Sequence, residues 1–140
     1  MKIFEVTAPV KATPERLWAV WSEVNRWAEW DPHEHDANLD GAFAAGSRGW
    51  SKPVGAPAGS FDLIEVDAPV HWTSRSALPG GSLTFDHRLY ATAEGTDVAI
   101  RATALGPLAP VVRLVWARRM RRDAPLTIAA LGHRAAVDPT

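Results

Sequence analysis

Residues 8–32 read APVKATPERLWAVWSEVNRWAEWDP, and this stretch holds four of the seven tryptophans of the chain. A helix is expected to begin here, because Thr13 is a good N-cap, Pro14 suits the first helical position and Glu15 favours the positive end of the helix dipole. The apolar residues that follow recur at i, i+3, i+4 and i+7: Leu17, Val20, Trp21 and Val24. This spacing predicts an amphipathic helix whose apolar stripe, including Trp21, belongs to the core.

The other three tryptophans of the stretch lie outside this apolar stripe. Trp18 lies one step off the apolar stripe and is expected at its edge. Trp27 and Trp30 are three residues apart on a second short helix, which Asn25 can cap and the Asp31–Pro32 pair ends. Their rings are expected on nearly the same face, as core on one side and as the mouth of a ligand pocket on the other.

The rest of the chain alternates in the manner of strands and ends in a helix. Residues 2–10 predict a strand, and roughly six more short strands follow at a spacing of about 8–12 residues, separated by Gly- and Pro-rich turns. A long helix follows from about residue 109, with a kink or break expected near Asp123 because Pro125 removes a backbone donor. This order predicts an α+β domain in which the last helix covers one face of a curved antiparallel sheet and leaves a space for a ligand.

The composition excludes several classes of protein. A chain of 140 residues is most simply one domain, and 46% hydrophobic residues are too many for a disordered chain. The absence of cysteine excludes disulfides, thiolate metal sites and a cysteine nucleophile. A net charge of −1 argues against nucleic-acid binding, and no apolar run is long enough for stable insertion into a membrane. The N-terminus, MKIFEVTAPV, is not a signal peptide, so a cytoplasmic protein is expected.

The opening stretch resembles the start of the polyketide cyclase/dehydrase-like families, with the pattern A-x-P-E-R-x-W-x-x-W-S-x-V-x-R-W-x-x-W-D-P. LDGAFAAGSRG at 39–49 resembles their next hairpin, FDHRLYATAEGTDVAIRATALGPLAP at 85–110 their last two strands, and ARRMRRDAPLTIAAL their C-terminal helix. These families belong to the START-like, birch-allergen-like superfamily, also called SRPBCC. The resemblance implies a helix-grip fold, with about seven antiparallel strands around an apolar cavity. It implies a single ligand-binding domain over residues 1–136, followed by a short tail at 137–140.

Three functions are compatible with these observations. The first is binding of a small hydrophobic molecule, which is aromatic, polyketide-like or lipid-like, in the cavity between sheet and helix. The second is an aromatase/cyclase-type enzyme that acts on a polyketide intermediate. The third is a protein-interaction module like the co-chaperones of the superfamily, which would require Trp18, Trp27 or Trp30 to be exposed. No cofactor is expected, and the chain is expected to be a monomer or a homodimer.

His87 is the candidate catalytic residue. It lies in SLTFDHRLYA at 82–91 and shares one face of the predicted strand with apolar side chains: Leu83, Phe85, Leu89 and Ala91. A histidine among apolar groups can orient a ligand or act as general acid or base, and it can equally be a core residue bonded to a neighbouring strand. The opposite face is expected to be solvated: Thr84, Asp86, Arg88 and Tyr90.

The remaining candidates are expected to line the same cavity. Trp72 and Ser74 share one face of VHWTSRSAL, as a pocket wall and a polar anchor or as plain core. The final helix adds Trp116 and Met120 on its apolar stripe. The complete predicted ligand-binding set is Trp27, Trp30, Trp72, Ser74, Phe85, His87, Trp116 and Met120.

Two polar clusters are open to a functional or a structural interpretation. In DPHEHDANLD at 31–40, His33 and His35 next to carboxylates form a spacing that can hold a divalent metal, but only loop residues are evident and a solvated acidic loop is favoured. No metal is expected. The arginines at 118–122 can meet an acidic partner or an anionic lipid head group, and a solvated helix face is favoured there too.

Overall fold

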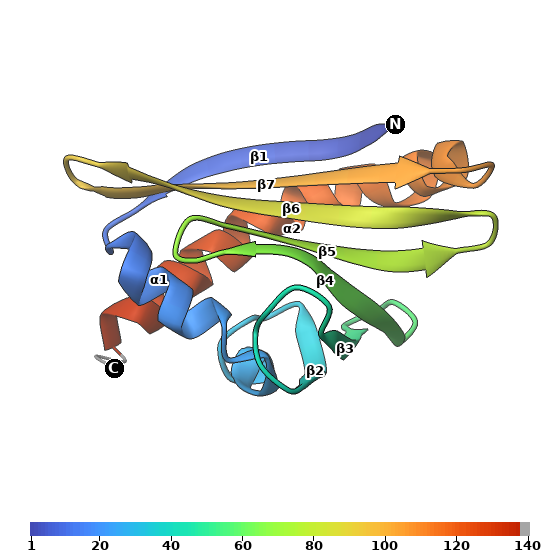
Figure 1. The fold of residues 1–140 in the computed structure, drawn as a ribbon. Coiled ribbons are helices and arrows are strands. Elements are labelled where there is room, and N and C mark those ends of the chain that lie inside the picture. The colour runs from blue at the N-terminus through green and yellow to red at the C-terminus, as the bar shows by residue number, and fades with distance from the viewer. Residues whose placement is uncertain (138–140) are drawn as a thin grey trace.

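An antiparallel sheet curves around one long helix in the computed structural model, which describes residues 1–137 (Figure 1). The strands are β1 (Lys2–Val10), β2 (Glu34–Asp40), β3 (Arg48–Pro53), β4 (Gly59–Asp67), β5 (His71–Leu78), β6 (Gly81–Thr92) and β7 (Gly95–Leu105). Helix α1 (Pro14–Trp21) and the 3₁₀ helix η1 (Val24–Glu29) follow β1, and α2 (Ala109–Val137) ends the described chain. The predicted helix-grip α+β architecture is confirmed. Of the expected tail, Val137 is part of α2, and residues 138–140 lie outside the described residues.

The strand order is β1-β7-β6-β5-β4-β3-β2, with antiparallel pairing throughout. Each strand from β2 to β6 therefore pairs with the next one in the sequence, as in a meander, and β1 forms the far edge beside β7. Phe4 of β1 lies opposite Ala102 of β7, which in turn lies opposite Phe85 of β6. This register aligns the apolar positions of three strands on one face, which we call the inner face. Helix α2 runs behind the sheet in Figure 1 and packs mainly on β1.

The helical hairpin after β1 forms as the sequence predicts, with one exception. Thr13 caps α1 by accepting a hydrogen bond from the backbone N of Arg16 at 3.3 Å. The stripe of α1 and the start of η1 is buried: Leu17, Val20, Trp21 and Val24. Asn25 does not cap η1, which begins at Val24; its side chain accepts a hydrogen bond from the backbone N of Leu39 at 2.8 Å instead. This bond ties η1 to β2.

Helix α2 continues through Pro125, so of the kink or break expected near Asp123, the break is wrong. Proline removes one hydrogen bond from the helix, but packing on both sides of it compensates. Ala124, Ile128 and Leu131 are buried beneath the sheet, whereas Pro125 itself is exposed. Close packing continues to the end, because a Cβ on Gly132 would come within 2.9 Å of Val10 Cγ1.

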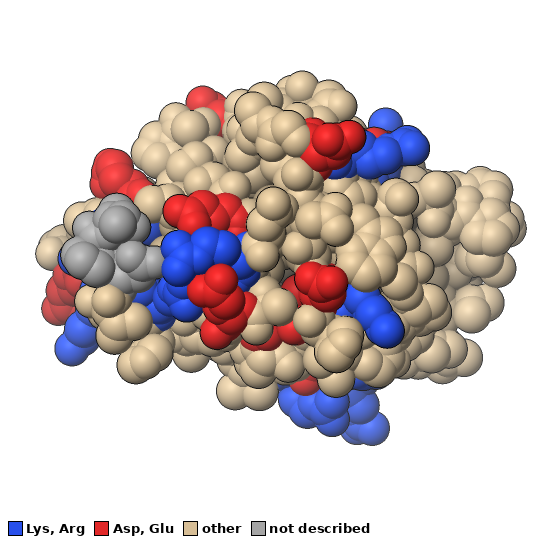
Figure 2. Space-filling view, turned by 90° about the horizontal axis from the view of Figure 1, so that it is seen from below, with Lys and Arg blue, Asp and Glu red and all other residues tan. Residues whose placement is uncertain are grey.

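Acidic and basic side chains are interspersed on the face of the molecule shown in Figure 2. The right-hand end of that view shows neither charge. Over residues 1–137, no helix combines the length and the apolar character needed to cross a membrane.

Candidate functional site

The sheet register brings the predicted strand residues together. On the inner face, His87 of β6 lies directly opposite Trp72 of β5, and Phe85 lies directly opposite Ser74. All four were predicted from alternation alone to share faces within their strands, but the sequence did not say which residues of the two strands meet. The inner face therefore holds half of the predicted ligand-binding set in one patch.

One end of this inner face is closed by aromatic rings. The ring of His87 stacks on that of Trp72, with centroids 3.5 Å apart and planes 4° apart. Trp21 meets both rings edge-on, at 5.1 Å from His87 and 5.4 Å from Trp72. Phe43 packs edge-on against Trp72 at 5.3 Å, and Trp27 lies tilted against it at 5.8 Å. Trp72 is consequently only 2% exposed, and these rings form a packed aromatic end.

His87 is neutral in this environment. Burial lowers its pKa to about 3, against a weak opposing effect of its contact with the Trp72 backbone. Its Nδ1 lies 3.3 Å from the carbonyl oxygen of Trp72. A carbonyl oxygen only accepts, so the single proton of the neutral ring belongs on Nδ1 and Nε2 is left as an acceptor.

Two indole nitrogens of this region are buried without a partner among the described residues. They are Nε1 of Trp72 and Nε1 of Trp30. A buried N–H that donates to nothing costs free energy, and such groups are uncommon in folded proteins. Trp27 differs, since its Nε1 donates to the backbone oxygen of Trp21 at 2.9 Å. The ring of Trp27 is also stacked on that of Phe61, with centroids 6.0 Å apart.

The other end of the inner face is less closed. Leu83 and Phe85 of β6 are only partly buried, although their partners on β7, Ala104 and Ala102, are both 0% exposed. Trp116 and Met120 of α2 are also only partly buried. These four apolar groups pack against the core and retain accessible surface. We call this set, Leu83, Phe85, Trp116 and Met120, the half-open end; Leu83 is its one member outside the predicted ligand-binding set.

A polar cluster joins α2 to the segment before β2. His33 Nδ1 lies 2.8 Å from Oγ1 of Thr127, and Asp31 accepts a hydrogen bond from that hydroxyl at 3.2 Å. Asp123 lies 3.5 Å from His33 Nε2, one turn earlier on α2. The expectation of a solvated loop therefore fails for Asp31 and His33, while His35 is exposed. Within residues 1–137, no three His, Cys, Asp or Glu side chains converge in a way that would hold a metal ion.

Glu34 continues this cluster into β2, and no pattern in the sequence indicated its role. Its carboxylate accepts a hydrogen bond from Ser51 Oγ at 2.5 Å. Burial raises the pKa of Glu34 to about 7, and the nearby charges of Asp31 and Asp36 act in the same direction. A bulge between Glu34 and Asp36 breaks the strand alternation that would otherwise have assigned its face.

Replacing Glu34 by glutamine is expected to stabilise the protein at pH 8 and not at pH 4. The folded state holds a proton on Glu34 between about pH 4.5 and 7 that the unfolded chain has lost, so the native residue costs stability as the pH rises through this window. Allowing for partial solvent screening, we expect a gain of about 1–2 kcal/mol at pH 8, measured by urea unfolding. Glu94→Gln, in the exposed β6–β7 turn, is the control. Equal gains at both pH values would show that the effect is not electrostatic.

The outer face of β5 and β6 carries a second polar cluster, which corrects the expectation of a solvated face. Asp86 bonds to Nε2 of His71 and accepts from Thr73 Oγ1 at 2.8 Å and from Arg88 Nε at 2.9 Å. Burial opposes ionisation of Asp86, but these hydrogen bonds together hold its pKa below the ordinary value. Asp86 is thus a half-buried structural link between the two strands, whereas Arg88 and Tyr90 are exposed as predicted.

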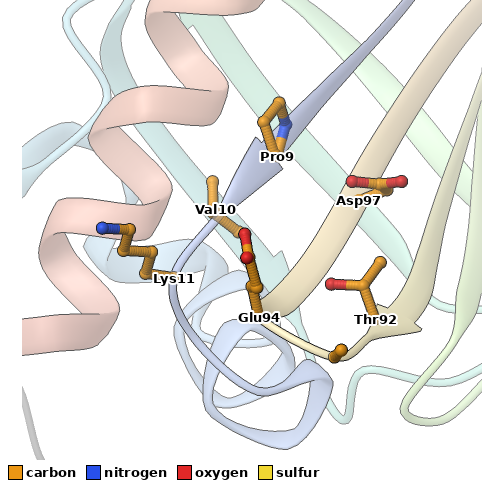
Figure 3. A pocket seen from close by; sticks show the side chains of 7 residues that line it. Pro9, Val10, Lys11, Thr92, Glu94 and Asp97 are labelled. Atoms are coloured by element: carbon orange, nitrogen blue, oxygen red, sulfur yellow. The ribbon is translucent and has the colours of Figure 1, made fainter.

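A surface hollow of about 480 Å³ lies apart from these groups (Figure 3). It is formed by the end of β1 and the β6–β7 turn, with Lys11, Glu94 and Asp97 at its rim. None of the predicted site residues lines it.

Comparison with known proteins gives a family and several structural neighbours. The sequence matches the family described as "Polyketide cyclase / dehydrase and lipid transport" over residues 1–135. A search of curated proteins gives no match. Among solved structures, TTHA0849 from Thermus thermophilus has a TM-score of 0.78 at 13% identity, with 100% of both chains covered.

Two further neighbours connect the fold to the families that the sequence resembles. The Zhui aromatase/cyclase from Streptomyces sp. R1128 has a TM-score of 0.76 at 15% identity, covering 98% of this chain and 94% of that one. Ara h 8.0201 has a TM-score of 0.72 at 13% identity, covering 96% of this chain and 97% of that one. At such identities these neighbours establish the helix-grip fold, and the family match establishes the relationship. The chain belongs to the polyketide cyclase/dehydrase and lipid transport family.

Proposed function

We propose that this protein binds a small, mainly apolar molecule between the inner face of the sheet and the first half of α2. The observation that carries the proposal is the half-open end. Leu83 and Phe85 retain accessible surface although they face inward beside completely buried alanines. An aromatic, polyketide-like or lipid-like ligand would cover this surface, and apolar burial would supply most of the affinity, at about 25 cal/mol per Å² before ordering costs.

The unpaired indole nitrogens support a ligand with an oxygen acceptor. Nε1 of Trp72 lies in the packed aromatic end, and Trp30, which carries the other unpaired Nε1, is the C-cap residue directly after η1. A carbonyl or hydroxyl oxygen that reached either group after a small movement of the rings would remove the cost of an unpaired donor. Ser74 and His87 Nε2 would then be the polar neighbours that orient it.

A binding function is favoured over an enzyme in which His87 is the catalytic residue. With its pKa lowered to about 3, His87 carries no proton to donate as an imidazolium near neutral pH, and it is a weak base. The third possibility, an interaction module built on exposed tryptophans, loses its main support. Trp18, Trp27 and Trp30 are all partly buried and packed against the core.

A cyclase remains the second candidate, because the family description names polyketide cyclases and the raised pKa of Glu34, rather than His87, suits proton transfer. A carboxyl group with a pKa of about 7 can both accept and donate a proton at neutral pH, which enolisation of a poly-β-keto chain requires. Incubation with such an intermediate tests this candidate directly. Cyclised product that is lost in Glu34→Gln would support it, and substrate that is bound in equal amount but recovered unchanged would reject it.

The binding proposal is tested with the apolar dye Nile red, whose fluorescence rises on transfer from water to an apolar site. Met120→Glu places a charge within the half-open end and is expected to weaken dye binding at least tenfold. The matched control is Ala129→Glu, on an exposed position of the same helix. Equal affinity in the two variants would overturn the proposed site, provided that circular dichroism shows both to be folded.

A further inference from the structure

Large aliphatic side chains are exposed on the side of α2 that faces away from the sheet. Leu114 is 87% exposed, and Val111 and Val115, its neighbours on the same face, are 52% and 58% exposed. These three side chains lie within five residues of one another on one side of α2 and form an exposed apolar patch. Isolated exposed aliphatic residues are common, but several on one helix face indicate a contact surface.

Arginines continue the same helix face. Arg118 and Arg122 follow Leu114 at intervals of four residues, and Arg121 lies beside them. All three are exposed. Arg122 bonds to Asp123 at 3.2 Å, whereas Arg118 and Arg121 form no ion pair with any residue from 1 to 137.

This charge is local to the helix. Helix α2 contains six arginines and no lysine, and Asp123 is its one acidic residue. The whole chain, by contrast, has 15 basic and 16 acidic residues. The helix is therefore a basic element on an otherwise acidic protein, and it presents its arginines beside its exposed aliphatic residues.

We propose that this face of α2, comprising Val111, Leu114, Val115, Arg118, Arg121 and Arg122, docks on the surface of an anionic lipid bilayer. The aliphatic groups would enter the boundary between head groups and acyl chains, and the arginines would meet lipid phosphates and carboxylates. A helix with an apolar side flanked by arginine is the arrangement that lies in the plane of a membrane interface. Each basic group near an anionic surface adds to the attraction.

A second copy of the chain is a poorer occupant of this face. A two-fold contact between two α2 helices would bring the arginine clusters of both copies near one another, with one acidic residue on each helix to offset them. Charge complementarity thus selects an anionic surface.

The proposal is independent of what the inner face binds, and vesicle sedimentation tests it. The wild-type chain is expected to sediment with vesicles of phosphatidylcholine and phosphatidylserine, to be released by high salt, and not to sediment with phosphatidylcholine alone. Leu114→Asp is expected to reduce the partition coefficient at least tenfold, as is the double variant Arg118→Glu/Arg121→Glu. Because these side chains are exposed, the variants are expected to fold, which circular dichroism verifies.

Matched substitutions on the opposite side of the molecule complete the test. Tyr90→Asp and Arg75→Glu change exposed residues on the outer face of the sheet and are expected to leave sedimentation unchanged. Failure of the wild-type chain to bind anionic vesicles would overturn the proposal, as would equal losses in the control variants. Light scattering distinguishes the alternative, since a dimer that Leu114→Asp dissociates, without any vesicle binding, would assign the patch to a second copy.

Discussion

Replacement of Trp72 by alanine is expected to lower the free energy of unfolding by about 3–5 kcal/mol. Trp72 is almost completely buried and stands at the centre of the packed aromatic end. Its ring contacts those of Trp21, Trp27, Phe43 and His87. Alanine would leave a void that these rings cannot fill together, because they belong to separate elements of the fold. Guanidinium unfolding followed by far-ultraviolet circular dichroism measures the change.

Two other substitutions determine whether the loss arises from packing. Trp116→Ala removes a ring of the same size from the half-open end and is expected to cost less than half as much, since Trp116 is only partly buried. Trp72→Phe keeps a ring against His87 while it removes the unpaired N–H, and it is expected to be milder than alanine. If Trp72→Ala were no more destabilising than Trp116→Ala, the aromatic end would not be the packed centre described above.

The elements that the sequence predicts well are those fixed by local signals. The cap at Thr13 and the stripe from Leu17 to Val24 depend on residues within two turns of helix, and both have the predicted form. The alternation in β6 placed Phe85 and His87 on one face in the same way. These patterns need no knowledge of the rest of the chain.

The features that the sequence could not provide depend on contacts between distant residues. The stacking of His87 on Trp72 requires the register of β5 and β6, which alternation leaves open by steps of two residues. Asn25 looked like a cap because no local signal reveals that Leu39 will lie beside it. The continuation of α2 through Pro125 likewise follows from burial of Ala124 and Ile128, which outweighs a local signal.

The polar part of the site shows the same limit. Asp31 and His33 lie in a stretch whose composition is that of a solvated loop, and the contact with Thr127 spans 94 residues from His33. Glu34 stands next to a bulge, and a bulge reverses the face that alternation assigns to the residues beside it. The H-x-H spacing was the one local signal in this segment, and it suggested a metal site. Within residues 1–137, however, no three His, Cys, Asp or Glu side chains converge to hold a metal ion.

Replacement of His87 by phenylalanine is expected to remove a large part of the acid sensitivity of the fold. Burial lowers the pKa of His87 from its ordinary value of 6.5 to about 3. Between these values the unfolded chain binds a proton on His87 that the folded chain excludes, so stability is lost as the pH falls from about 6.5 to 3. A shift of this size corresponds to a difference on the order of 5 kcal/mol across the window. Phenylalanine keeps a planar ring against Trp72 and cannot titrate.

The quantity to measure is the stability of the wild type minus that of His87→Phe, from unfolding experiments at several pH values. A constant packing penalty of phenylalanine does not change how this stability difference varies with pH. The contribution of Glu34 also cancels from the difference, because its raised pKa makes stability fall with rising pH between about 4.5 and 7 in both proteins. The difference should therefore decline steadily as the pH falls below 6.5, and it should do the same in a Glu34→Gln background, because Glu34 does not contribute to the shift of His87. A flat difference would mean that His87 can take up a proton in the folded state. In that case the aromatic end would open to water, and His87 would return as a candidate acid for catalysis.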